Sequence, residues 1–231
     1  MLNPQPEPVG QRSHVSIDFA HISARERYKL LIGSVVPRPI ALVTTRHPDG
    51  TVNAAPYSFF NCLSADPAIL ALGVENHNDM SFKDTTLNIR LTEEFTVNIV
   101  DHALVDAMNV CAVPFPSHID ELAEAGLTPA PGETVQCPYI YEAPIAFECR
   151  RHLTLGLGKS REIVLGQVTR MHIREDLVDQ ERFYIDQLAL DAVGRMGGHG
   201  YSTTRNQFDL PTMSHEQWQA LKSKLREIEI P

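Results

Sequence analysis

Short apolar runs of strand length recur along the first half of the chain. Residues 40–45, 69–74 and 95–100 are such runs. Runs of four to eight residues between turn signals are typical of strands. Asp49-Gly50 is a hairpin signal, and it leads into a return strand over residues 51–59. We therefore expect residues 40–45, 51–59 and 69–74 to form three consecutive strands of one antiparallel meander.

The second half of the chain adds two longer strands, over residues 145–155 and 162–172, joined by a turn rich in glycine and charge. Helices alternate with the strands. Ser23 and Glu26 have the spacing of a capping box, and Gly33 predicts where that first helix ends. The expected helices span residues 23–32, 83–91, 101–111, 117–124 and 214–228. This pattern predicts a mainly β protein with helical decoration, built on an antiparallel barrel.

The first residues differ from the rest in composition. Four of the first ten are proline or glycine, which prevents regular structure. We expect an extended arm over residues 1–22 and a single domain over residues 23–231. The arm has no apolar core, so it does not resemble a signal peptide.

Composition and charge narrow the classes of function. The chain has 231 residues, of which 43% are hydrophobic and 21% charged, as is usual for a soluble globular protein. Its net charge of −9 disfavours general binding to nucleic acid or to anionic membranes, although one local basic pocket is compatible with it. The four cysteines form no C-x-x-C pair. We interpret them as reduced thiols of a cytoplasmic protein.

One segment has the residues of a phosphate site. Ser81, Lys83 and Thr85 surround the start of the helix expected at residues 83–91. Free N–H groups and the positive end of the dipole favour an anion there, and Lys83 adds a cation. Ser81 or Asp84 is the expected cap. Taken alone, the segment fits a plain helix start with a solvated lysine better.

Polar groups also gather on the first two strands. Thr44 and Thr45 end an otherwise apolar run, where their hydroxyls need partners, and Asn53, Ser58 and Asn61 lie on the return strand or its exit. Such groups would suit the polar chain and ring edge of a flavin mononucleotide (FMN), whose phosphate the helix start would hold. The alternative is that they bond backbone groups at the rim of a barrel.

Aromatic and cationic residues complete this stretch. Phe59 and Phe60 would form apolar walls for a flat ring, or they belong to the core. Arg38 stands between Pro37 and Pro39, which stiffen the backbone at a strand edge. Its guanidinium suits an anion or a ring carbonyl, and the alternative is a surface arginine.

Four motifs in order closely resemble the flavin reductase-like, FMN-binding split-barrel family. This family includes flavoredoxins and the reductase components of two-component flavin monooxygenases. The motifs are G-S-V-V-P-R-P-I-A-L-V-T-T (33–45), N-A-A-P-Y-S-F-F-N (53–61), K-D-T-x-x-N-I (83–89) and E-F-x-V-N (94–98). The resemblance is weaker over residues 140–205, where R-M-G-G-x-x-Y (195–201) carries it.

The resemblance implies a split-barrel homodimer with one FMN per subunit, and hydride transfer from NAD(P)H to the flavin. It assigns the phosphate to Ser81, Lys83 and Thr85. It implies that the ribityl chain and ring are lined by Asn53, Ser58, Phe59, Phe60 and Asn61. It places Arg38, Thr44 and Thr45 at the ring or its edge. No protein acid or base is required, because the hydride chemistry belongs to the two cofactors.

Some alternatives stay open. A flavin-binding electron carrier without NAD(P)H activity would share all these residues, and a partner monooxygenase is compatible with either function. The histidines show no metal-binding spacing such as H-E-x-x-H. His199, between glycines, would either cover a nicotinamide or form a plain surface turn.

Overall fold

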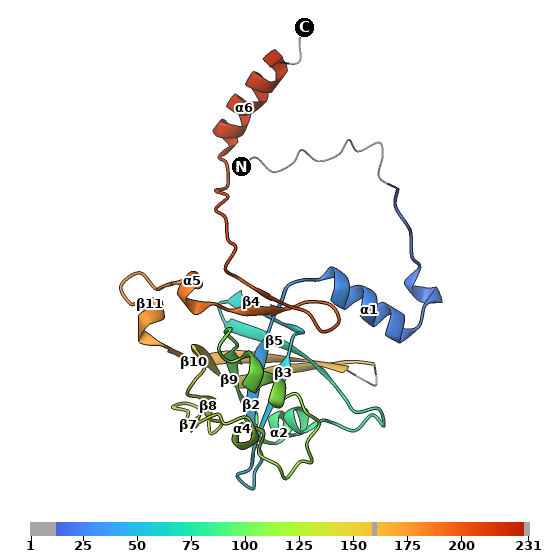
Figure 1. The fold of residues 1–231 in the computed structure, drawn as a ribbon, viewed down its shortest axis with the longest axis vertical. Coiled ribbons are helices and arrows are strands. Elements are labelled where there is room, and N and C mark those ends of the chain that lie inside the picture. The colour runs from blue at the N-terminus through green and yellow to red at the C-terminus, as the bar shows by residue number, and fades with distance from the viewer. Residues whose placement is uncertain (1–12, 159–160, 229–231) are drawn as a thin grey trace.

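A computed structural model describes residues 13–158 and 161–228 (Figure 1). Residues 1–12 of the expected arm lie outside the described residues. The helices are α1 (Ala24–Ser34), α2 (Asp84–Thr92), α3 (Val105–Val110), α4 (Glu121–Glu124), α5 (Gln187–Leu190) and α6 (His215–Ile228), with 3-10 turns at Phe19–His21 and Glu175–Leu177. The strands are β1 (Arg38–Pro39), β2 (Ala41–Arg46), β3 (Val52–Tyr57), β4 (Phe60–Ala65), β5 (Ala68–Glu75), β6 (Glu94–Ile99), β7 (Pro129–Ala130), β8 (Tyr139–Ile140), β9 (Ile145–Leu157), β10 (Arg161–Ile173), β11 (Val178–Asp179), β12 (Tyr184–Ile185), β13 (Val193–Arg195) and β14 (Tyr201–Thr203).

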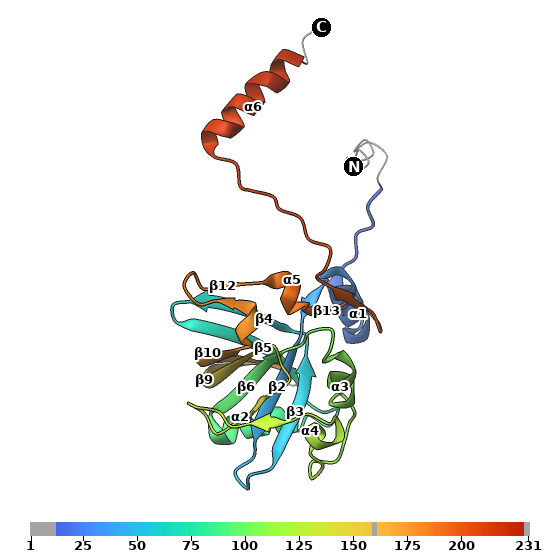
Figure 2. The same cartoon turned by 60° about the vertical axis from the view of Figure 1, so that its left-hand side comes forward.

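A seven-stranded antiparallel sheet dominates the described residues, with the strand order β3-β2-β6-β9-β10-β5-β4. A smaller sheet, β1-β13-β14, lies at one end of it (Figure 2). The prediction of a mainly β, antiparallel protein with helices is confirmed. The large sheet does not close by hydrogen bonds, since β3 and β4 remain its two edges.

The expected meander is wrong in one respect. β2 and β3 do pair, with Val43 opposite Ala55, but β5 lies at the far end of the sheet beside β4 and β10. The return strand expected over residues 51–59 ends at Tyr57, because the chain bends at Ser58 and Phe59, and a further strand, β4, begins at Phe60. This bend carries the chain from one edge of the sheet to the other.

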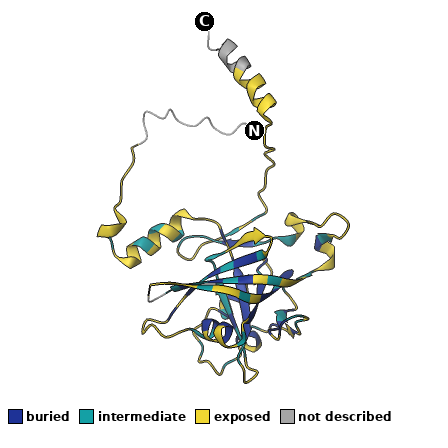
Figure 3. Ribbon diagram, turned by 180° about the vertical axis from the view of Figure 1, so that it is seen from behind, coloured by how far each residue is buried: buried dark blue, intermediate teal, exposed yellow. Residues whose placement is uncertain are grey.

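The sheet is buried on both faces, which explains the continuous apolar run of β2. Leu42 faces a cluster that includes Met108 of α3 and Leu122 of α4. Ala41 and Val43 face the other cluster, which contains Phe95 of β6 and other residues from β5, α2 and β10. Figure 3 shows this burial along the central strands, while α1 and α6 remain largely exposed. A strand between two cores needs apolar side chains at successive positions.

Local signals placed most helix ends correctly. Ser23 and Glu26 form the expected capping box of α1, and Ser214 exchanges hydrogen bonds with Gln217 at the start of α6. Gly33 does not end α1, which continues to Ser34. The helix expected at residues 101–111 is shorter, because Asp101 accepts a hydrogen bond from the N–H of Leu104 and precedes the helix.

The chain leaves the body at both ends of the described part. Residues 204–214 extend away from the sheets and lead into α6, which stands apart from them (Figures 1 and 2). Among the described residues, no helix is long and apolar enough to cross a membrane. All four cysteines are free, and only Cys62 is exposed.

Candidate functional site

A groove follows β3 at the edge of the large sheet. It consists of two adjoining pockets of about 250 and 530 Å³, which share Pro56, Tyr57 and Ala112. The smaller pocket begins at Asn53, and the larger extends to Ser58 and beyond. We call these two adjoining pockets together the β3 groove. Its two ends differ in chemistry.

The smaller end is built for an anion. Lys83 and Thr85 line it at the start of α2, together with Asn53, whose Nδ2 donates to the Thr85 hydroxyl over 3.0 Å. Lys83 is the N-cap of α2, and no side chain caps the helix from that position. The N-terminal N–H groups of a helix lack intrahelical partners, so they suit an anion beside the Lys83 ammonium.

Two carboxylates also line this end and set its charge balance. Asp84 is the first residue of α2, and Glu121 of α4 accepts a hydrogen bond from the N–H of Ala54 over 3.0 Å. Burial raises the pKa of Glu121, although the Ala54 N–H opposes this. Burial likewise raises the pKa of Tyr57 to about 12, so its phenol stays protonated and available as a donor.

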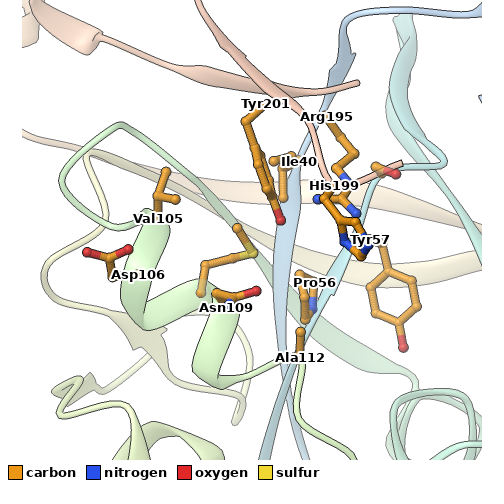
Figure 4. A pocket seen from close by; sticks show the side chains of 12 residues that line it. Ile40, Pro56, Tyr57, Val105, Asp106, Asn109, Ala112, Arg195, His199 and Tyr201 are labelled. Carbon is orange, nitrogen blue, oxygen red and sulfur yellow. The ribbon is translucent and has the colours of Figure 1, made fainter. Parts of the chain in front are cut away.

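The larger end lies between α3 and the β13–β14 hairpin (Figure 4). Asp106 and Asn109 approach it from α3, while His199 and Tyr201 approach from the hairpin. The Arg195 guanidinium lies 4.5 Å from the centre of the Tyr201 ring. This end is the larger of the two, and its aromatic and polar side chains suit a flat ring with polar edges.

Arg38 is not available to the groove in the way its sequence context suggested. It is 7% exposed, and its guanidinium donates to the carbonyls of Ile32, Val35 and Met196 and to the hydroxyl of Ser58. Burial lowers its pKa. Arg38 thus connects the end of α1 and the β13 hairpin to the floor of the groove, and it is a positioning residue.

Three further predicted residues are bonded elsewhere. Thr44 is fully buried and donates to the carbonyl of Pro138, and Thr45 is fully buried and accepts from Asn88. Their expected contacts with a ring are not supported, because both hydroxyls face the interior. Ser81 is exposed, and its hydroxyl donates to the carboxylate of Asp79. It does not line the groove.

The bend after β3 divides the remaining predicted residues. Ser58 lines the β3 groove, whereas Phe59, Phe60 and Asn61 line a separate, mostly apolar pocket on the other side of the bend. Alternation along a single strand would instead have grouped Ser58 with Phe60 and Phe59 with Asn61. Of the eleven predicted residues, the groove therefore unites Asn53, Ser58, Lys83 and Thr85 in one subunit.

Comparison with known proteins assigns the chain to a family. Residues 32–189 match the flavin reductase like domain family. The chain belongs to this family. Its members are generally flavin-binding oxidoreductases, and the matched region contains β3, α2, α3 and α4, which form most of the groove.

Similar proteins cover nearly the whole flavin reductase-like chain. A protein of Deinococcus radiodurans is 44% identical over 213 residues, covering 90% of this chain and 93% of that protein. Nitrilotriacetate monooxygenase component B from Bacillus cereus is 33% identical with a TM-score of 0.83, covering 86% of this chain and 100% of that one. A 2-nitrobenzoate 2-nitroreductase from Pseudomonas fluorescens is 35% identical with a TM-score of 0.81. The match covers 87% of this chain and 98% of that one.

Sequence reasoning did not assign several groove residues. Those from the loop after α3 come from residues 112–115, which no motif marked. Arg195 and Tyr201 belong to a motif that resembles the flavin reductase-like family, and His199 lies between them, so a signal for these three did exist. Glu121 and His77 had no such signal. Packing brings α4 to α2, and no motif marked His77 in the loop that leads from β5 into α2.

Proposed function

We propose that this flavin reductase-like protein binds FMN along β3 and transfers a hydride to it from NAD(P)H. The observation that carries the proposal is the pair of adjoining pockets along β3, lined by Lys83 and Thr85 at one end and by Tyr201 at the other. A strand rises about 3.3 Å per residue, so Asn53 to Ser58 span about 16 Å, enough for an extended mononucleotide. Lys83, Thr85 and the start of α2 at the smaller end, with Ser58 and Tyr201 at the larger end, support FMN with its phosphate at α2.

The protein would supply binding and orientation. Lys83, Thr85 and the first turn of α2 would hold the phosphate, and Asn53 would fix the Thr85 hydroxyl. Pro56 and Tyr57 would lie beside the ribityl chain, and Ser58, His199 and Tyr201 would surround the ring. Bound FMN would accept a hydride at its ring, so the chain needs only to place the two cofactors together and to exclude water.

The purified protein is expected to carry flavin absorbance, or to gain it when FMN is added. Anaerobic NADH or NADPH should then bleach that absorbance in stopped-flow measurements, with one nicotinamide faster than the other. Bound flavin that neither nicotinamide reduces would instead identify an electron carrier. A protein that stays colourless with added FMN would contradict flavin binding altogether.

The similar component B from Bacillus cereus supports one route for the electrons. We propose that reduced flavin leaves this site for a partner monooxygenase, as in a two-component system. The similar 2-nitroreductase supports a nitroaromatic acceptor as the second route. Oxidation of NAD(P)H should be stimulated by free FMN on the first route and by a nitrobenzoate on the second.

A second subunit would complete the split barrel. The two edge strands of the large sheet, β3 and β4, do not pair with each other. On β9, every second residue from 153 to 157 is an exposed leucine (Leu153, Leu155 and Leu157), so these three side chains share one face. Exposed apolar faces of this kind mark interfaces between proteins. Sedimentation velocity at micromolar concentration should give twice the 25.8 kDa chain mass. A monomer that still binds flavin would contradict a site shared between subunits.

A further inference from the structure

A second cavity, separate from the β3 groove, lies between α1 and the sheet. Its volume is about 700 Å³. Three arginines, Arg25, Arg27 and Arg161, line it together with the rings of Tyr28 and Phe59. We call it the arginine groove. The β3 groove contains none of these side chains, and Arg161 is the cross-strand partner of Leu157, so the cavity borders the strand that carries the exposed leucines.

The two rings and one of the cations form an ordered cluster. The ring centres of Tyr28 and Phe59 are 6.4 Å apart with a tilt of 32°. The Arg161 guanidinium lies 5.2 Å from the Phe59 ring and 5.9 Å from the Tyr28 ring, and Glu75 binds it over 3.0 Å. Tyr28 is 44% exposed, so one face of its ring is open for stacking.

The groove is also a local centre of positive charge. It contains three arginines and one acidic residue, Glu75, in a chain whose net charge is −9. Arg27 donates through Nη1 to the carbonyls of Phe19 and Ile22, which fixes the start of α1, while Arg25 is exposed. A ligand that matches such a site has an aromatic ring and negative charge. Phosphate suits the arginines, because one guanidinium can bind two phosphate oxygens at once.

The position of the groove connects it to the flavin site. Phe59 lines the arginine groove, and the preceding residue, Ser58, lines the β3 groove. The two cavities therefore lie on opposite sides of one bend in the chain. A dinucleotide could place one ring beside the proposed flavin ring and its other half against Tyr28 and the arginines.

We propose that the arginine groove binds the adenosine diphosphate half of the NAD(P)H donor. This rests on the proposed function. The adenine stacks on Tyr28, and the pyrophosphate pairs with Arg25 and Arg161. The nicotinamide half then reaches the β3 groove across the bend at Ser58 and Phe59.

Isothermal titration with ADP-ribose, which lacks the nicotinamide, tests the site directly. The FMN-loaded full chain should bind it, and Arg25→Ala or Tyr28→Ala should weaken binding at least tenfold. Lys29→Ala is the matched control, because Lys29 is an exposed cation on the same helix that does not line the groove. Unchanged unfolding midpoints would exclude a general loss of structure.

Steady-state kinetics then separate the two halves of the donor. Arg25→Ala should raise the KM for the dinucleotide about tenfold and leave kcat unchanged. The same variant should leave the KM for reduced nicotinamide mononucleotide unchanged, because that donor lacks the adenosine half. Equal effects on both donors would overturn the proposal.

The remaining outcomes are also decisive. Absence of ADP-ribose binding to the wild-type protein overturns the proposal, and so does binding that is unaffected by both groove substitutions. If Arg25→Ala also converts a dimer to a monomer in sedimentation, the groove belongs to the subunit interface instead. If ADP-ribose binds through Arg25 but neither nicotinamide reduces the flavin, the nucleotide site stands and the reductase function fails.

Discussion

Replacement of Lys83 by alanine is expected to weaken FMN binding by about 1.5–3 kcal/mol, or about 10- to 150-fold in Kd. Lys83 stands at the N-terminus of α2 and lines the narrow end of the β3 groove. Its removal would leave two acidic residues, Asp84 and Glu121, at that end. Titration of the apoprotein with FMN, followed by quenching of flavin fluorescence, measures the change.

Two further variants make this result specific. Lys83→Arg keeps the positive charge, so it should recover most of the lost affinity. Lys29→Ala removes an exposed lysine of α1 that does not line the β3 groove, and it should leave the Kd unchanged. A folded Lys83→Ala protein with wild-type affinity would show that the phosphate lies elsewhere.

Glu148→Gln is expected to reduce the free energy of unfolding by about 3 kcal/mol at pH 7. The Glu148 carboxylate is fully buried on β9 and accepts hydrogen bonds from three consecutive N–H groups, those of Glu133, Thr134 and Val135. His172 also contacts it over 2.6 Å. The glutamine amide would turn a donor toward donors, which leaves buried polar groups unpaired.

The same carboxylate makes stability depend on pH. Burial by itself would raise the pKa of Glu148, but the hydrogen bonds from Thr134, Glu133 and His172 outweigh it and lower the pKa from 4.5 to about 2. A carboxyl whose pKa is lower in the folded state stabilises the fold above its unfolded pKa. Its contribution, about 3 kcal/mol, is lost as the pH falls from about 5 to about 2.

Denaturant unfolding between pH 7 and pH 2 tests this linkage. The difference between wild type and Glu148→Gln should shrink as the pH falls below about 5. Glu142→Gln is the matched control, because Glu142 also accepts a backbone N–H, from Thr128, but is exposed. Glu142→Gln should reduce the free energy of unfolding by much less than Glu148→Gln does. Parallel pH curves for wild type and Glu148→Gln would contradict the role assigned to Glu148.

The prediction from sequence succeeded where the signal was local. The capping box of α1, the hairpin at Asp49-Gly50 and the long β9–β10 pair all depend on residues close together in the chain. It failed at Ser58 and Phe59, where two strands meet in a stretch rich in aromatic residues, Tyr57 to Phe60. An aromatic run has high strand propensity whether or not the backbone bends, so propensity alone does not locate the bend.

For the site, the sequence by itself determined the pair of residues that we propose to hold the phosphate, Lys83 and Thr85. Lys83 and Thr85 are two residues apart at a helix start, so local geometry brings them together wherever the helix packs. Only the tertiary structure decided the rest. It turned Arg38 inward to three carbonyls, buried Thr44 and Thr45, and brought Arg195 and Tyr201 to β3. These placements depend on contacts between segments that are distant in the sequence. Such contacts are stabilised by the apolar surface that the whole fold buries, which no short stretch of sequence specifies.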